Sequence, residues 1–421
     1  MALHAGGDLR PPRIDGARLM TRLAALGEVG ALPGGGNARL ALTDADKAGR
    51  DLVVSWMREL GLDVRIDGIG NVFGVMAGRD DIDPVLCGSH IDTVRTGGLY
   101  DGNYGVLAGL EIIETLRENG IVTRRPVAVA FFTNEEGARF APDMMGSLVH
   151  VLGMALEDAL ETVGIDGAMV GDELRRIGYA GLTPVPAIAP YAFVELHIEQ
   201  GPVLATEGLR IGVVERVQGI SWQEVTIIGQ SNHAGTTPMR FRHDAGYVAA
   251  RIAVTVRDIV HTMGGDQVGT VGAITLQPNL VNVIAASATL TVDLRNTDET
   301  LLQQAEHQLA TELDSLAAAE GVTINKRPLA RLEPVVFSPP VVELIERTAH
   351  QFALSTRRMP SGAGHDAQML ARVCPAAMIF VPSIDGLSHN PAERTHPDDL
   401  EAGANVLLHT VLALASEGIE A

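Results

Sequence analysis

An α/β fold interrupted by an inserted α+β domain is the fold class that the sequence predicts. Two observations predict it. In the first half of the chain and again near its end, apolar runs of strand length alternate with amphipathic stretches of helical spacing, which is typical of βαβ units. Between these parts the pattern changes to four strands and two helices. We therefore expect an outer domain made of residues 1–214 and 333–421, with residues 215–332 inserted into it.

The composition is that of a globular protein with an acidic surface. Of 421 residues, 46% are hydrophobic and 20% are charged, which is enough apolar material for two cores. Asp and Glu outnumber Lys and Arg by 52 to 32, and the formal charge of −20 argues against binding to nucleic acid or to an anionic membrane. No run reaches the ~18 apolar residues of a membrane span, and the N-terminus carries no apolar signal segment. Cytoplasmic residence is therefore the expectation.

The elements of the outer domain follow from hydrophobic periodicity. Apolar positions three and four residues apart predict helices, and short alternating or continuous apolar runs predict strands. Thr43 precedes one helix as a plausible N-cap, and Gly27 follows another as a plausible stop. The predicted helices span 15–26, 44–60, 105–119, 340–354 and 397–417, and the predicted strands span 63–67, 71–75, 85–87, 126–133, 192–196 and 376–381.

The insert shows a different order of elements. Its predicted strands span 222–229, 268–276, 288–294 and 323–330, and its predicted helices span 243–263 and 299–319. Four strands and two helices in βαββαβ order fit a ferredoxin-like sandwich.

Residues that can bind metal ions follow the apolar strands of the outer domain. They are His90, Asp92, Asp101, Glu135, Glu136, His197, His365, Asp366 and His389. Open α/β sheets bind ligands at the carboxyl ends of their strands, and imidazole with carboxylate suits Zn²⁺, Mn²⁺ or Co²⁺. Any one of these side chains is more often a surface or capping residue, and His90 with Asp92 alone fits a structural pair equally well. Asp101 is the candidate for a carboxylate that bridges two metals.

The motifs together resemble the M20 metallopeptidase superfamily, within it the hydantoinase/carbamoylase branch of N-carbamoyl-L-amino-acid hydrolases, β-ureidopropionases and allantoate amidohydrolases. The matching segments are GSHIDT (88–93), DGNYGVL (101–107), NEEG (134–137), HIEQGP (197–202), NHAGTTPM (232–239) and SHN (388–390). The resemblance implies a mixed-sheet α/β catalytic domain of the zinc-exopeptidase type. It also implies that the ferredoxin-like insert serves as a lid and as the surface of a homodimer.

Two divalent metal ions are implied by the resemblance. One ion would be held by His90, Asp101 and His197, and the other by Asp101, Glu136 and His389. The expected ion is Zn²⁺, with Mn²⁺, Co²⁺ and Ni²⁺ as alternatives.

Further roles are implied for side chains near the metals. Asp92 would accept the second N–H of His90 and fix its tautomer. Glu135 would act as general base and then as general acid, and His233 of the insert would stabilise an oxyanion. His365 and Asp366 would either support the metal ligands or cap a short helix.

A substrate carboxylate is implied as well. Arg295 offers a planar fork for bidentate binding, and the resemblance adds Gln200, Asn282 and the backbone of Gly364 to this clamp. An arginine at the end of a strand also pairs with a nearby acid, here Asp293 or Asp298, and this alternative stays open.

The function that the resemblance implies is hydrolysis of the ureido C–N bond of an N-carbamoyl-L-amino acid, which releases the amino acid, ammonia and carbon dioxide. Allantoate amidohydrolase is the alternative, since allantoate also presents a carboxylate and ureido groups. An aminopeptidase is the next alternative. A metal-free relative that only binds ligands is the last, because every expected ligand is present.

Overall fold

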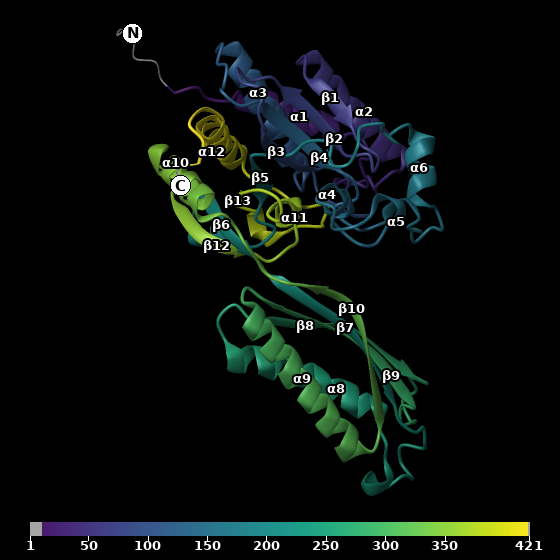
Figure 1. The fold of residues 1–421 in the computed structure, drawn as a ribbon. Helices are drawn as coiled ribbons and strands as arrows, with labels where there is room; N and C mark the ends of the chain where they lie inside the picture. The colour runs from purple at the N-terminus through teal and green to yellow at the C-terminus, as the bar shows by residue number, and fades with distance from the viewer. Residues whose placement is uncertain (1–10, 420–421) are drawn as a thin grey trace. The chain divides into compact units, whose positions relative to one another are not determined.

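The computed structural model describes residues 11–419, which form two compact units (Figure 1). Unit 1 contains the residues up to Glu215 and those from Phe337 onward, and unit 2 is Arg216–Val336. In the described part of the chain, no helix is long and apolar enough to cross a membrane.

A mixed sheet of nine strands forms the centre of the α/β part (Figure 1). Its order is β1-β2-β4-β3-β5-β13-β6-β11, and β12 also pairs with β6. The strands are β1 (Asp63–Ile66), β2 (Val72–Met76), β3 (Val85–His90), β4 (Val127–Phe132), β5 (Ala192–Ile198), β6 (Ile211–Val217), β11 (Val335–Val336), β12 (Thr356–Ser361) and β13 (Ala376–Val381). The neighbours β4, β3, β5 and β13 run parallel, so their carboxyl ends lie at one edge of the sheet.

The central strands are buried along their whole length because helices cover this sheet. Among them, α3 packs on β3, α12 packs on β13, and α11 contacts β3, β5 and β13. The side chain of Thr43 accepts a hydrogen bond from the N–H of Asp46, as an N-cap should. The helices are α1 (Gly16–Gly27), α2 (Asp44–Glu59), α3 (Asn103–Glu118), α4 (Met145–His150), α5 (Leu156–Leu160), α6 (Val170–Ile177), α7 (Val203–Glu207), α10 (Pro339–Gln351), α11 (Asp366–Leu370), α12 (Pro397–Ser416) and the 3-10 turn η2 (Ile384–Gly386).

Unit 2 has the βαββαβ order that its sequence predicts. Its sheet is antiparallel with the order β10-β7-β9-β8, and α8 and α9 pack against it. Alternate residues of β9 are buried, so one face of the sheet meets the helices. The elements are β7 (Gly219–Ile228), the 3-10 turn η1 (Met239–Phe241), α8 (Ala245–Met263), β8 (Val268–Gln277), β9 (Ser287–Asn296), α9 (Glu299–Glu320) and β10 (Thr323–Leu332).

Several elements differ from the sequence prediction. The strand that precedes the first motif extends to His90 rather than ending at Cys87, which places the histidine inside the sheet. Strands β6 and β12 and the short helices α4 to α7 were not predicted. β6 pairs with β13 and β12, which lie far away in the sequence, so a local pattern carries little sign of it.

Candidate metal centre

The carboxyl edge of the parallel strands gathers the predicted metal ligands. His90 is the last residue of β3, and His197 is the last but one of β5. Glu136 follows β4, and His389 lies in the loop after β13. Asp101 stands just before α3, which packs on β3 and so returns the chain to the same edge.

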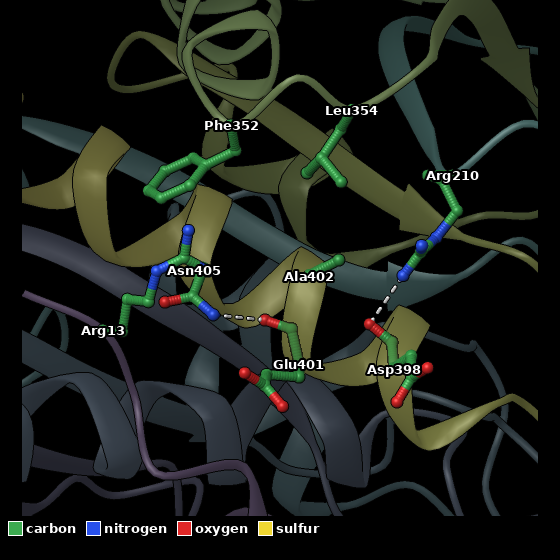
Figure 2. A pocket seen from close by; sticks show the side chains of 8 residues that line it. All are labelled: Arg13, Arg210, Phe352, Leu354, Asp398, Glu401, Ala402 and Asn405. Carbon is green, nitrogen blue, oxygen red and sulfur yellow. Dashed lines mark hydrogen bonds between the residues drawn. The ribbon is translucent and has the colours of Figure 1, made fainter.

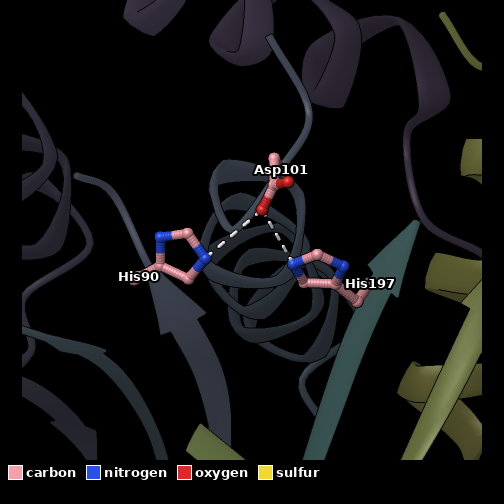
Figure 3. Close-up of side chains that lie close together, drawn as sticks. All are labelled: His90, Asp101 and His197. Atoms are coloured by element: carbon pink, nitrogen blue, oxygen red, sulfur yellow. Dashed lines mark ion pairs between the residues drawn. The ribbon is translucent and has the colours of Figure 1, made fainter. Parts of the chain in front are cut away.

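The first ligand group joins His90, Asp101 and His197 (Figure 3). Oδ1 of Asp101 lies 3.4 Å from Nε2 of His90 and 3.2 Å from Nε2 of His197. The Nδ1 atoms of the two histidines lie 2.9 Å from the backbone oxygens of Asp92 and Ile198. A neutral ring that donates from Nδ1 has its free lone pair on Nε2. The Nε2 atoms are therefore the ones that can bind a metal, and Nε2 of His197 also accepts the N–H of Gly102 at 3.1 Å.

The second ligand group joins Asp101, Glu136 and His389. Nε2 of His389 lies 3.2 Å from Oε2 of Glu136 and 3.6 Å from Oδ2 of Asp101. Asp101 thus turns one carboxylate oxygen toward each group. The first group is buried, whereas the side chain of His389 is 51% exposed, so the second group opens toward solvent.

Burial and neighbouring charged groups shift the pKa values of this cluster in different directions. Burial alone would raise the pKa of Asp101, but the imidazoles of His197 and His90 hold that pKa well below its usual range. Burial raises the pKa of Glu135 well above its usual range, although the imidazole of His90 opposes the shift. The hydrogen bond to Glu136 raises the pKa of His389 to about 9.

The two groups fit a pair of divalent ions. Each offers imidazole nitrogen and carboxylate oxygen, whose ligand atoms lie within 4.8 Å of one another, and this donor set suits Zn²⁺ and Mn²⁺. A third group, formed by Glu195, His197 and His365, does not fit in the same way. The carboxylate of Glu195 already accepts hydrogen bonds from Ser89 Oγ at 2.6 Å and from the N–H of Ala367 at 2.8 Å.

The contact predicted for Asp92 is made by a different atom. Its backbone oxygen, and not its carboxylate, faces Nδ1 of His90. The carboxylate instead accepts the N–H groups of Glu135 at 3.2 Å and Glu136 at 3.3 Å. Asp92 therefore orients His90 through the backbone and holds the Glu135–Glu136 loop through its side chain.

Glu135 contacts His90 of the first ligand group, and His365 packs against His197 of the same group. Oε2 of Glu135 is 3.3 Å from Nε2 of His90, and the residue is 6% exposed. The ring of His365 meets the ring of His197 edge to face, with centroids 4.6 Å apart. Burial raises the pKa of Asp366, at the start of α11, well above its usual range.

Gln200 and Gly364 lie in the same unit as the metal ligands. Nε2 of Gln200 donates to Oδ2 of Asp101 at 2.8 Å and to Oγ of Ser388 at 3.2 Å. Its Oε1 is buried and has no hydrogen-bond partner among the described residues. A free acceptor can receive a substrate N–H, and the predicted contact of Gln200 with a substrate carboxylate stays a prediction. Gly364 lies in the loop after β12, near Met144.

The predicted residues of unit 2 lie at opposite ends of its sheet. His233 and Asn282 are neighbours, because the N–H of Ala234 donates to the backbone oxygen of Asn282 at 2.9 Å. Arg295, near the far end of β9, pairs with Asp293 at 2.9 Å, which is the alternative that the sequence left open.

Two residues at the site were not predicted. Arg39 is fully buried and donates to the backbone oxygen of Ile91 and to Oδ1 of Asn103, each at 2.7 Å. Glu393 accepts the N–H of Asp101 at 3.3 Å. Glu393 had one signal in the sequence, its position four residues after a predicted ligand. Arg39 had none, because most of its partners are backbone oxygens.

A separate cavity of about 320 Å³ is lined by the first turns of α12 and by the segment between α10 and β12 (Figure 2). Its lining combines Phe352 with Arg13 and Arg210, and Arg210 donates to the backbone oxygen of Asp398 at 2.8 Å. None of the three ligand groups found in residues 11–419 includes a residue of this cavity.

Comparison with known proteins shows what this arrangement is similar to. The model of peptidase family M20/M25/M40 matches residues 86–413. The chain belongs to peptidase family M20/M25/M40. The match spans all six motifs on which the resemblance rests, so that resemblance is confirmed.

Relatives of the M20/M25/M40 chain cover almost its whole length. It is 41% identical to an N-carbamoyl-L-amino-acid amidohydrolase of Rhizobium meliloti, over 96% of this chain and 97% of the relative. It is 38% identical to an allantoate amidohydrolase of Escherichia coli, over 93% and 96%. A solved hydantoinase/carbamoylase-family amidase of Burkholderia multivorans is 46% identical, with a TM-score of 0.93 over 96% and 98%. The predicted mixed α/β fold is confirmed.

Proposed function

We propose that this M20/M25/M40 protein is a cytoplasmic, binuclear-metal amidohydrolase that cleaves the ureido C–N bond of N-carbamoyl-L-amino acids. One observation carries the metal chemistry, namely that Asp101 turns one oxygen to each of two histidine-containing groups. The names of the relatives at 41% identity support the substrate class. The two cysteines are buried and free, which suits a reducing compartment.

The metal ions would be held by the two groups that share Asp101. We propose Zn²⁺ as the resident ion, with Mn²⁺, Co²⁺ or Ni²⁺ as substitutes. Two divalent ions at such a site lower the pKa of water and polarise a carbonyl oxygen.

Glu135 is proposed as the group that moves the proton. Its carboxyl is buried beside His90, and burial raises its pKa, so it can hold a proton between two steps of the reaction. It would take a proton from the attacking water and give it to the leaving nitrogen. The carbamate released in this way breaks down to ammonia and carbon dioxide.

His233 is proposed as the donor to the oxyanion. Its Nδ1 accepts hydrogen bonds from the N–H groups of Gly235 at 3.0 Å and Thr236 at 3.2 Å. A ring that accepts at Nδ1 carries its proton on Nε2. The turn thus prepares His233 as an Nε2–H donor, which is what stabilisation of a negative oxygen requires.

The substrate is proposed to be held at both ends. Arg295 would bind the carboxylate in bidentate fashion, with Asp293 keeping the guanidinium in place before the substrate arrives. Asn282 and the backbone of Gly364 would complete this clamp. At the ureido end, the free Oε1 of Gln200 would accept a substrate N–H.

The distance between His233 and Arg295 within unit 2 supports the proposal of a homodimer. Arg295 pairs with Ile220 at one end of the sheet, whereas Ser287, beside the His233 turn, pairs with Ile228 at the other. Eight residues of strand at about 3.3 Å each separate these ends by roughly 26 Å. One copy of unit 2 is thereby unable to bring both residues to one small substrate. We propose that two copies of the chain complete each site.

Allantoate hydrolysis is the second candidate, because a relative at 38% identity is an allantoate amidohydrolase and allantoate carries the same two functional groups. Release of ammonia from N-carbamoyl-L-methionine, N-carbamoyl-β-alanine and allantoate should be compared with cleavage of dipeptides, each with Zn²⁺, Mn²⁺, Co²⁺ or Ni²⁺ added. We expect the carbamoyl-L-amino acid to have the highest kcat/KM. Preferred cleavage of dipeptides without ammonia would disprove the proposal.

A further inference from the structure

Glu393 ties the loop that carries His389 to the loop that carries Asp101. It lies in the segment between η2 and α12 and is 3% exposed. Its Oε1 accepts the N–H of Tyr100 at 3.0 Å and the N–H of Asp101 at 3.3 Å. A contact between residues almost three hundred positions apart therefore fixes the backbone at the shared metal ligand.

Ser388 adds a second attachment between the same two loops. Its Oγ donates to Oδ2 of Asp101 at 3.0 Å and lies 3.4 Å from Oε2 of Glu393. His389 itself has a φ of +53°, a conformation that costs free energy for a residue with a side chain and is kept by the contacts around it. The segment from Leu387 to His396 has no helix or strand to hold His389 in place.

Gly98 leaves the space that the Glu393 carboxylate occupies. A Cβ atom at residue 98 would stand 2.2 Å from Oε1 of Glu393, and its three nearest neighbours would all be atoms of that side chain. The backbone of Gly98 does not have the positive φ that favours glycine. Glu393 is therefore what an alanine at residue 98 would meet first.

We propose that Glu393 is a positioning residue for the second metal ion, the one that Asp101, Glu136 and His389 would hold. By accepting the N–H groups of the Asp101 loop, it sets His389 at the right distance from Asp101. The first ion depends on it less, because its histidines belong to β3 and β5. This inference rests on the proposed binuclear centre and is independent of the substrate.

Calorimetric titration of the metal-free protein with Co²⁺ or Mn²⁺ alone tests the proposal. The wild type should bind two ions. Glu393→Ala should lower the affinity for the second ion about 10- to 100-fold, as loss of a residue behind a ligand typically does. The affinity for the first ion should change less than about threefold. Glu393→Gln should keep both ions, because its Oε1 can accept the same two N–H groups.

Gly98→Ala gives a second route to the same result. It should displace the side chain of Glu393 and lower the affinity for the second ion to a similar extent. In a Glu393→Gly background no Cβ atom remains 2.4 Å from the added methyl group, so the space is free and the methyl group should have no further effect, which is strong coupling in a double-mutant cycle. Independent, additive losses from the two substitutions would overturn the proposal.

Asp67→Asn is the matched control. Asp67 is equally buried and accepts the N–H groups of Ile69 and Asn71, but it does so in the turn between β1 and β2. It should leave both ions in place, and thermal unfolding should show that the variants are folded. Retention of both ions by Glu393→Ala, or equal loss of both, would overturn the role of Glu393 alone. A wild type that binds no divalent ion would overturn the binuclear centre with it.

Discussion

Oε2 of Glu135 lies 3.3 Å from Nε2 of His90, so a buried carboxyl contacts a candidate metal ligand without belonging to either ligand group. Glu135→Gln should keep both metal ions and lower kcat by about 10²- to 10⁴-fold, the usual contribution of a general base. Ammonia release and calorimetric metal titration give the two readouts. Glu157→Gln, an exposed glutamate on α5, is the control, and near-normal turnover of Glu135→Gln would remove Glu135 from the mechanism.

Arg295→Lys should raise KM for carboxylate substrates about tenfold or more, because the charge stays while the bidentate fork is lost. The effect should disappear when the substrate is the corresponding amide, which has no carboxylate. Arg327→Lys is the control, since Arg327 is another arginine of this sheet and pairs with Glu224. An equal change in KM for the acid and the amide would contradict carboxylate binding by Arg295.

Mixtures of two inactive variants test whether each site needs two copies of the chain. His233→Ala should lower kcat about 10²- to 10³-fold, as loss of an oxyanion donor does, and Arg295→Ala should be nearly inactive. After subunit exchange, half of the dimers are mixed and one site in each is intact, so about a quarter of wild-type activity should return. No recovery in a mixture proven to contain mixed dimers would show that a single copy supplies both residues.

His150 should make the fold less stable in acid. Burial between Phe73 and Phe132 lowers the pKa of His150 from 6.5 to about 4. Between these two values the unfolded chain binds a proton that the folded chain does not, so the free energy of unfolding falls as the pH falls, by up to about 3 kcal/mol.

Urea unfolding of the metal-free protein between pH 7 and pH 4 measures this slope. His150→Leu should flatten it, because the variant has no group to protonate there, whereas His261→Gln on the exposed side of α8 should not. Equal slopes for wild type and His150→Leu would show that His150 is protonated as readily in the folded chain as in the unfolded one.

The strands that carry the candidate site could be predicted from the sequence, because a strand that is buried on both faces is a continuous apolar run. The sequence alone therefore predicts that His90, Glu136, His197 and His389 lie at one edge of the sheet. Strand β6 could not be predicted in this way, since its partner β13 comes more than 150 residues later and a short run has no local sign of that pairing.

Contacts made by particular atoms were beyond the sequence. Asp92 was expected to meet His90 through its carboxylate, yet its backbone oxygen makes that contact. Arg39 donates mostly to backbone oxygens, which every residue has, so the residue types along the chain do not indicate these contacts. The distance between His233 and Arg295 could be found only from the register of the sheet, because a sequence motif contains no information on distances in space.

The order of the ligands along the chain has a consequence during protein synthesis. His90, Asp101 and His197 are all made before the insert begins, whereas His389 follows it. A growing chain therefore carries all three proposed ligands of the first ion long before it carries His389, a proposed ligand of the second.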